Sequence, residues 1–241
     1  MIEEKKRYIE QEIKNMGLDI QPFQIQQFYD YYEILIQWNE FMNLTAITDF
    51  KDVVKKHFVD SLSIITVKNM QNVDCMIDIG TGAGFPGIPL KIMFPHLKLT
   101  LLDSLRKRID FLNHLVKKLE LKDVETVHGR AEDYSKPGKK REQYDLCVSR
   151  AVAKLSVLSE YCLPYVKIGG SFISYKSGNI KEEINHSRSA VFLLGGKMIE
   201  CKIFRLPETD IDRSLVLIDK VNGCPKKYPR KPGMAAKNPI S

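Results

Sequence analysis

Three glycines at alternate positions, Gly80, Gly82 and Gly84, stand between two apolar segments of the chain. The preceding run, Val73 to Ile79, predicts a buried strand, and the following run, Ile88 to Phe94, predicts a short helix. Glycine adopts positive φ at little cost and lets a ligand approach the backbone closely. The segment therefore predicts a strand–loop–helix cradle for a nucleotide, and the identity of that nucleotide decides the function.

Two nucleotides compete for this loop. The run from Gly82 to Gly87 satisfies the dinucleotide pattern G-x-G-x-x-G, with Asp103 about 20 residues further on. However, Asp78 places a carboxylate just before the first glycine, where it would repel a pyrophosphate. S-adenosylmethionine carries a cationic ammonium and sulfonium and no phosphate, so an acid at this point suits it. Pro86 also lacks the amide that a phosphate would use. The loop favours the methyl donor over a dinucleotide or a purely structural turn.

Length and composition allow one large domain with an appended subdomain. The chain has 241 residues, of which 44% are hydrophobic, and no apolar run reaches the 18 residues that suggest a membrane span. Its amino terminus is charged and lacks the apolar core of a signal peptide. The five cysteines are scattered and form no C-x-x-C pair, and the five histidines show no metal-ligand spacing. We expect no disulfide, no metal and a cytoplasmic location.

The chain divides into three parts by pattern. Residues 1–70 predict an N-terminal helical subdomain, with helices over Gln24 to Trp38 and from a cap at Asp49 or Asp52 to about Val67. From residue 71 to 221, strands alternate with helices, which predicts a doubly wound α/β sheet. The last two strands follow one another without a helix, so one of them should be antiparallel. Residues 222–241 form a basic tail that contains proline and glycine.

The expected elements of the sheet region follow from apolar periodicity. After the first strand we expect strands over residues 98–103, 124–128, 144–149, 170–176, 197–206 and 214–221, and further helices over 106–121, 155–163 and 180–193. A charged loop, Lys136 to Arg141, is expected to be solvated.

Ligands of doubly wound sheets bind beyond the carboxyl ends of the strands. Asp78 and Gly80 follow the first strand, and Asp103, which can accept the ribose hydroxyls, ends the second. Ala131 and Glu132 follow the third strand, where they can contact adenine. Arg150 follows the fourth. Helix capping, a turn and a salt bridge are the structural alternatives for Asp103, Glu132 and Arg150, respectively.

The end of the fourth strand restricts the reaction. It reads Ser149-Arg150-Ala151-Val152 and lacks the Asp/Asn-Pro-Pro-aromatic pattern of enzymes that methylate exocyclic amines. Methylation of pyrimidine carbon five needs a cysteine nucleophile, and Cys147 should be buried in the strand and inert. A ring nitrogen with a free lone pair, such as guanine N7, needs no general base. Its methylation would depend on proximity and orientation, so no catalytic residue is assigned beyond Arg150 as a candidate for orienting donor or guanine.

The chain resembles the bacterial 16S ribosomal RNA guanine-N7 methyltransferase family, RsmG, also called glucose-inhibited division protein B or GidB. The resemblance covers nearly the whole length. The glycine loop continued by Phe85-Pro86-Gly87 and the tail motif Tyr228 to Gly233 are its most specific parts. The other matching segments are residues 42–47, 57–61, 102–104, 129–132 and 149–151.

The resemblance implies a class I S-adenosylmethionine-dependent methyltransferase with a Rossmann-like fold. It implies transfer to N7 of one guanine near nucleotide 527 of small-subunit rRNA, with S-adenosylhomocysteine as the product. It also implies donor contacts at Gly80, Phe85, Ala131, Glu132 and Arg150. The resemblance further implies a cytoplasmic, monomeric enzyme. Such an enzyme has no obligate protein partner and does not associate with a membrane. Our full set of donor-binding candidates is Asp78, Gly80, Gly82, Phe85, Asp103, Ala131, Glu132 and Arg150.

The net charge of +7 is concentrated in the tail, which holds basic residues and no acid from Val221 onward. Such a segment can bind the phosphates of rRNA, with Tyr228 offering a face for stacking on a base. A solvated, partly disordered terminus is the alternative. The RNA-binding candidates are Lys226, Lys227, Arg230, Lys231 and Lys237.

Two other functions stay open on the sequence alone. One is a nicotinamide-dependent oxidoreductase, and the other is an RNA-binding assembly factor with a vestigial donor pocket. For Asn43, His57 and Asp60 we favour a polar network that fixes the helical part to the sheet.

Overall fold

The computed structural model describes residues 1–150, 152–178 and 180–240. Seven strands form one sheet in the order β3-β2-β1-β4-β5-β7-β6. β7 pairs antiparallel with both β5 and β6, and the other neighbours are parallel, which confirms the expectation of one antiparallel strand at this end. The strands are β1 (Cys75–Ile79), β2 (Lys98–Asp103), β3 (Val124–His128), β4 (Tyr144–Arg150), β5 (Val166–Ser177), β6 (Gly196–Arg205) and β7 (Asp212–Lys220).

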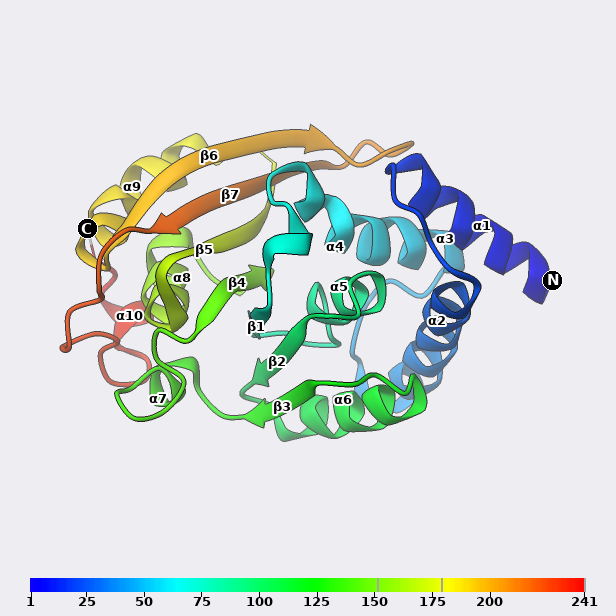
Figure 1. Cartoon of the computed structure of the whole chain (residues 1–241), viewed down its shortest axis with the longest axis horizontal. Coiled ribbons are helices and arrows are strands. Elements are labelled where there is room, and N and C mark those ends of the chain that lie inside the picture. Colours follow the sequence, from blue (N-terminus) through cyan, green and yellow to red (C-terminus); the bar gives the residue numbers. More distant parts are fainter. Residues whose placement is uncertain (151, 179, 241) are drawn as a thin grey trace.

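Helices cover both faces of the sheet. In Figure 1, α5 and α6 lie on one side with the N-terminal helices, while α8, α9 and α10 lie on the other. Alternation along β1 explains this arrangement: Met76 packs into one hydrophobic cluster, whereas Ile77 and Ile79 pack into the cluster on the opposite face. The helices of the sheet region are α5 (Gly87–Met93), α6 (Arg106–Lys118), α7 (Ala131–Tyr134), α8 (Leu155–Cys162), η4 (Leu163–Tyr165), α9 (Lys181–Leu193) and α10 (Met234–Lys237).

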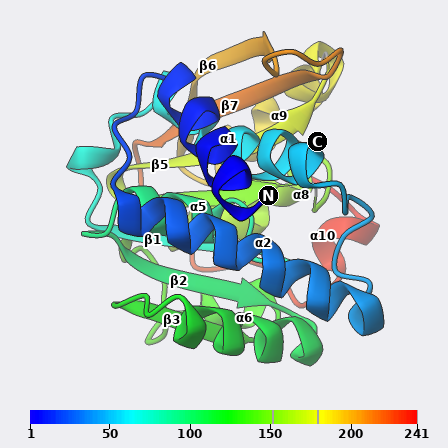
Figure 2. The same ribbon diagram turned by 90° about the vertical axis from the view of Figure 1, so that its right-hand side faces the viewer.

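The first 70 residues are helical in the structure. A capping side chain marks the start of the third helix, because the Asp49 carboxylate accepts a hydrogen bond from the Asp52 amide at 3.0 Å. Figure 2 shows α1 and α2 side by side next to the sheet. The helices here are α1 (Ile2–Asn15), α2 (Pro22–Met42), α3 (Phe50–Val53), η1 (Val54–Val59), α4 (Asp60–Leu62), η2 (Ser63–Thr66) and η3 (Met70–Asn72). Among the described residues, no helix is long and apolar enough to cross a membrane.

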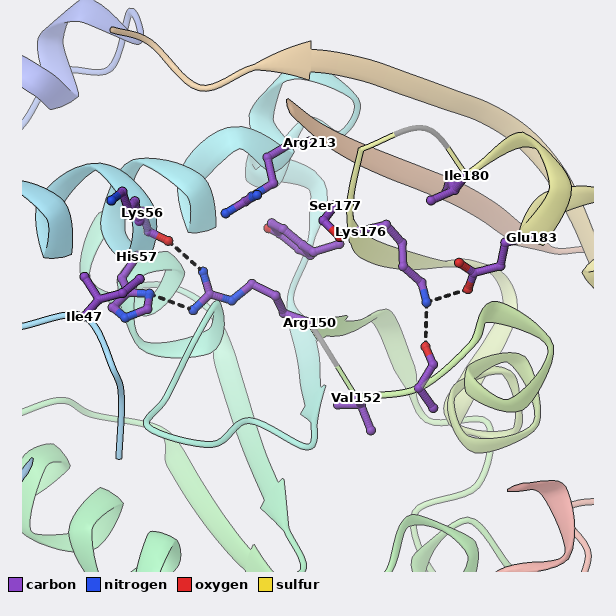
Figure 3. Close-up of a pocket in the computed structure, with 12 residues that line it drawn as sticks. Ile47, Lys56, His57, Arg150, Val152, Lys176, Ser177, Ile180, Glu183 and Arg213 are labelled. Atoms are coloured by element: carbon purple, nitrogen blue, oxygen red, sulfur yellow. Dashed lines mark hydrogen bonds and ion pairs between the residues drawn. The ribbon is translucent and has the colours of Figure 1, made fainter. Parts of the chain in front are cut away.

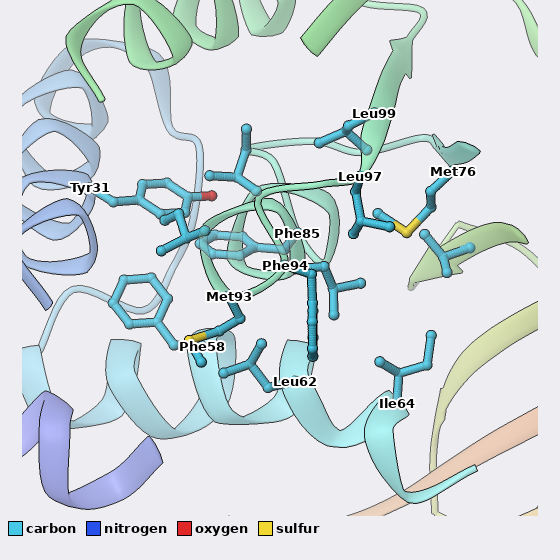
Figure 4. Packing of buried hydrophobic residues seen from close by; sticks show 14 of the residues in the cluster. Tyr31, Phe58, Leu62, Ile64, Met76, Phe85, Met93, Phe94, Leu97 and Leu99 are labelled. Carbon is cyan, nitrogen blue, oxygen red and sulfur yellow. The ribbon is translucent and has the colours of Figure 1, made fainter. Parts of the chain in front are cut away.

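One apolar core joins the N-terminal helices to the sheet. Tyr31 of α2 and Phe58 of η1 point toward Phe85 of the glycine loop (Figure 4). The Tyr31 and Phe85 rings stack with centroids 5.1 Å apart, and the Tyr31 hydroxyl donates to the Ala83 carbonyl at 2.6 Å. Burial of these aromatic side chains therefore fixes the back of the loop.

The tail packs on the sheet domain and contains one short helix, α10. It is therefore not the solvated, partly disordered terminus that the sequence left as the alternative. Arg141 donates to the carbonyls of Tyr228 (2.8 Å) and Cys224 (2.6 Å). The charged loop that ends at Arg141 is thus exposed to solvent over much of its length, as expected, and also attaches the tail to the domain. The Arg230 side chain pairs with the buried Glu160 carboxylate at 2.6 Å. The two Arg141 bonds satisfy backbone carbonyls of the proline-rich tail that are not paired in a helix or sheet, and the Arg230–Glu160 pair fastens the tail to α8.

Candidate functional site

The glycine loop joins β1 to α5 at the carboxyl edge of the sheet, and Asp78 fastens it at both ends. One carboxylate oxygen, Oδ2, accepts hydrogen bonds from the Thr81 hydroxyl at 2.8 Å and the Gly87 amide at 2.9 Å. Asp78 thus occupies an amide at the start of α5 that a pyrophosphate would need. The structure gives a geometric reason to prefer a ligand without phosphate at this loop.

Burial raises the pKa of Asp78 to about 7, against the opposing effect of its two hydrogen bonds. The second carboxylate oxygen, Oδ1, is buried and has no hydrogen-bond partner among the described residues. A buried, unpaired carboxylate oxygen is unfavourable unless a donor reaches it. The residues present therefore fit a ligand with a cationic amino group, directly or through water.

Asp103, at the end of β2, holds the loop from the neighbouring strand. Its Oδ2 accepts from the Gly82 amide at 2.9 Å and from Arg108 at 3.2 Å, and its Oδ1 accepts from the Leu105 amide. The side chain is buried, so much of its hydrogen-bonding capacity serves the loop. The predicted bond to a ribose would use the remaining lone pairs.

A cavity of about 380 Å³ opens above the loop. Its size lies in the range of small-molecule sites. Five of the predicted donor residues line it. Gly80, Gly82, Asp103 and Arg150 lie at or just after the ends of three strands, and Phe85 lies in the glycine loop. A Cβ at Gly82 would meet no described atom within 4 Å, which means that this glycine borders open space.

Three predicted donor residues lie elsewhere. Among the described residues, the lining leaves out Asp78, which is beneath the loop, and Ala131 and Glu132 of α7. The Glu132 carboxylate accepts from the Gly233 amide at 3.0 Å and so holds the tail. The predicted contacts of these residues with adenine and methionine stay predictions.

Arg150 is the centre of a polar network at the end of β4. Its guanidinium lies over the Phe85 ring, 5.0 Å from the centroid. It donates to the Asp60 carboxylate at 2.8 Å and to the Lys56 carbonyl at 3.2 Å. Asp60 also accepts from Arg213 at 3.0 Å. The buried Asp60 therefore joins the N-terminal helices to the ends of β4 and β7, which confirms the network expected for this residue.

His57 belongs to the same network and is neutral, whereas Asn43, the third residue expected in it, is exposed at the C-terminal end of α2. Arg150 can only donate, so the His57 Nδ1 atom, 3.2 Å away, must carry a lone pair. The proton is then on Nε2, 2.9 Å from the Thr45 hydroxyl oxygen. Burial, reinforced by the charge of Arg150, lowers the pKa of His57 to about 3. The His57 ring stacks on Phe85 with centroids 4.4 Å apart, so the network also fixes the cavity wall.

A second cavity, of about 540 Å³, adjoins the first. Both are lined by His57, Arg150 and Val152. Figure 3 shows the second cavity, with Arg150 and His57 at one end and Lys176 and Glu183 at the other. No sequence motif marks Lys176, Glu183 or Arg213, which come from the last third of the chain, so none of the three was predicted. Thr45 and His57 lay within matching segments, which was the available signal for them.

The tail candidates divide into two groups. Lys226, Lys227, Lys231 and Lys237 are exposed. Arg230 is tied to Glu160, and Tyr228 is only 8% exposed, with Lys227 and Arg230 near its ring. The expectation that Tyr228 offers a free stacking face is wrong, because the aromatic ring is packed against the domain.

Solved structures share the fold at low sequence identity. The crystal structure of M. jannaschii TYW2 in complex with AdoMet superposes with a TM-score of 0.54 at 14% identity, covering 68% of this chain and 76% of that one. The YcgJ protein from Bacillus subtilis gives a TM-score of 0.52 at 12% identity over 69% of this chain and all of that one. These likenesses show the class I methyltransferase fold expected for the sheet.

Sequence relatives are much closer. The family model described as rRNA small subunit methyltransferase G matches residues 24–215. The protein named ribosomal RNA small subunit methyltransferase G from Alkaliphilus metalliredigens is 53% identical over 98% of this chain and 99% of its own length. The protein of the same name from Lachnoclostridium phytofermentans is 50% identical over 95% of both chains. The chain belongs to the GidB family, whose members are described as rRNA small subunit methyltransferase G.

Proposed function

We propose that this protein transfers a methyl group from S-adenosylmethionine to N7 of a guanine in the 16S rRNA of the small ribosomal subunit. Family membership supports the donor and the class of acceptor. The observation that carries the proposal is the meeting of two cavities at Arg150, His57 and Val152, one above the glycine loop and one beside it. A transferase needs two such sites in contact, because the reacting atoms must come within about 3–3.5 Å.

Within the donor cavity, Gly80, Gly82 and Phe85 would shape the walls and Asp103 would accept the ribose hydroxyls. The unpaired oxygen of Asp78 would face the methionine amino group through the floor of the loop. When bound, the donor supplies an electrophilic methyl group on a sulfonium. We assign Ala131 and Glu132 to the adenine end, with Glu132 also holding the tail.

Arg150 would orient the donor, the guanine or both from the boundary of the two cavities. N7 of guanine carries a lone pair, so the reaction requires alignment rather than proton removal. The rigid network through Asp60 and His57 supports that role, because it fixes the guanidinium from three directions. The site residues themselves supply orientation and exclusion of water.

The exposed lysines of the tail, Lys226, Lys227, Lys231 and Lys237, would contact rRNA phosphates. We retain Arg230 as a candidate with a second role, since its guanidinium fastens the tail to Glu160. Replacing the four lysines by glutamine should flatten the salt dependence of RNA binding. An unchanged slope would argue against an RNA-binding tail.

We also propose the division into residues 1–70, 71–221 and 222–241 as a helical subdomain, a methyltransferase domain and a tail. An rRNA acceptor would place the enzyme in the cytoplasm. We propose that the protein acts as a monomer and without an obligate protein partner.

The test is transfer of labelled methyl from S-adenosylmethionine to small-subunit particles that lack the modification, with the product mapped. A single N7-methylguanine is the expected result. Binding of S-adenosylmethionine without transfer to any rRNA would support an assembly factor instead. Binding of NADH and not of S-adenosylmethionine, followed by fluorescence, would revive the oxidoreductase.

A further inference from the structure

The second cavity is the natural place for the acceptor base. It shares a wall, formed by His57, Arg150 and Val152, with the proposed donor cavity. A base inside it would therefore lie next to the donor. Three cationic side chains line this second cavity, Lys56, Arg213 and Lys176, and each is paired with a carboxylate, so the cavity offers oriented polar groups that suit a base. This inference rests on the proposed function and concerns how the base is chosen.

A lysine–glutamate pair stands at the end of this cavity away from His57 (Figure 3). The Lys176 Nζ atom lies 2.6 Å from Glu183 Oε1 and donates to the Ala153 carbonyl as well. The Leu155 amide, at the start of α8, donates to the same Glu183 oxygen. Both side chains are largely covered, with 11% and 26% exposed. The pair therefore has a fixed orientation set by β5, α8 and α9.

The pair presents a donor beside an acceptor. An ammonium has three N–H groups and no lone pair, and an ionised carboxylate only accepts. The pairing edge of guanine offers the O6 acceptor, followed by the N1–H and N2–H donors. The corresponding edge of adenine offers an N6–H donor beside the N1 acceptor, which is the opposite order. Single-stranded RNA bases are commonly selected through this edge.

We propose that Lys176 and Glu183 read the target guanine, with Lys176 donating to O6 and the Glu183 carboxylate accepting from N1–H and N2–H. The N7 atom is on the adjoining edge of the base and faces the Arg150 end of the cavity. Adenine in the same position places its N1 lone pair against the carboxylate. Specificity then arises because adenine sets its N1 lone pair against the Glu183 carboxylate and its N6–H group against the Lys176 ammonium, so neither contact can form.

Inosine tests the proposal, because it keeps N7, O6 and N1–H and lacks only the N2 amino group. Small-subunit particles are reconstituted with 16S rRNA that carries guanosine or inosine at the target position. The wild-type protein is expected to show a kcat/KM about ten- to a hundred-fold lower for inosine, as befits one lost hydrogen bond to a charged group. Equal rates on both particles would overturn the proposal whatever the variants do.

The variant Glu183→Gln should lower kcat/KM on guanosine particles and bring the guanosine-to-inosine ratio toward one. Its matched control is Glu182→Gln, which removes the same charge from an exposed neighbour on α9 and should keep the wild-type ratio. Calorimetry of S-adenosylmethionine binding checks that each variant is folded. If Glu183→Gln does not fold, Lys176→Met takes its place; because it removes the donor to O6, which guanosine and inosine share, it should lower kcat/KM on both particles and keep the ratio. A wild-type ratio in folded Glu183→Gln, or wild-type rates in Lys176→Met, would contradict the assignment.

The outcomes separate this inference from the proposed function. If the wild-type protein methylates no guanosine particle at N7, the proposed function fails. If it methylates guanosine and inosine equally well at N7, the proposed function stands and the base-reading role of Lys176 and Glu183 fails.

Discussion

The buried Asp60 carboxylate pairs with two arginines. These pairs should contribute more to the free energy of unfolding than an exposed aspartate–arginine pair does. Asp60 is 2% exposed, and its two oxygens accept from Arg150 at 2.8 Å and from Arg213 at 3.0 Å. Asp60→Asn removes the negative charge and turns one acceptor into an N–H donor that faces a guanidinium. The two arginine side chains are 15% and 21% exposed, so water would screen them only in part.

Breaking a buried pair by removing one partner costs about 3–5 kcal/mol. Asparagine keeps one of the two side-chain oxygens, so the loss should lie at the lower end of this range. We expect Asp60→Asn to lower the free energy of unfolding by about 3 kcal/mol. The matched control is Asp212→Asn, because Asp212 pairs with Arg205 at 3.1 Å and both side chains are more than half exposed. Exposed pairs contribute about 0–1 kcal/mol, and the control should stay in that range.

Urea denaturation followed by circular dichroism measures both variants. An unchanged m-value would show that the midpoint shift reports stability alone. A loss below 1 kcal/mol for Asp60→Asn, or equal losses for the two variants, would refute the argument that the network is buried and coupled. Loss of affinity for S-adenosylmethionine in Asp60→Asn should accompany the destabilisation, because Arg150 lines the cavity that we propose for the donor.

Three further predictions concern the histidine, the loop and the tail. The folded state holds the pKa of His57 near 3, whereas the unfolded chain binds a proton near pH 6.5, so stability is lost as pH falls below 6.5. Relative to His57→Gln, the wild-type free energy of unfolding should fall by about 1 kcal/mol per pH unit from pH 6.5 to 4, and parallel pH profiles would contradict this. Gly84→Ala should unfold at a lower temperature than Gly82→Ala. Both glycines have positive φ, +98° and +62°, but a Cβ at Gly84 would lie 2.8 Å from Ile88, whereas Gly82 borders open space. Gly82→Ala should instead lose affinity for S-adenosylmethionine in calorimetry, and equal melting temperatures would speak against the packing argument. Glu160→Gln should free the tail, so that trypsin cleaves after Lys226 and Lys227 faster than in the wild type, as mass spectrometry of timed digests would show.

Local pattern determined much of the fold. The strands at 98–103 and 124–128 have the predicted bounds, since alternating and continuous apolar runs leave few alternatives over such short segments. The cap at Asp49 and the antiparallel strand near the end were likewise predictable, because each depends on neighbouring residues. The glycine loop indicated the donor for the same reason: Asp78, Thr81 and Gly87 interact across only nine positions.

Tertiary structure decided what depends on contacts between distant parts of the chain. Nothing in the sequence near Tyr228 shows that its ring is buried, or that Arg230 finds Glu160 some 70 positions earlier. The strand β5 begins at Val166, earlier than the apolar pattern predicted, because pairing with β4 extends it.

The sequence by itself determined the sheet, the loop and the class of ligand, because these follow from periodicity and from interactions within a few residues. Only the folded chain brings Asp60 of the N-terminal helices to Arg150 and Arg213, and Lys176 of β5 to Glu183 of α9. The pairing of charged side chains depends on which strand ends meet at one edge of the sheet, and strand order is a global property. The glycine loop that we propose for the donor was thus readable from local sequence, whereas the proposed acceptor site required the tertiary structure.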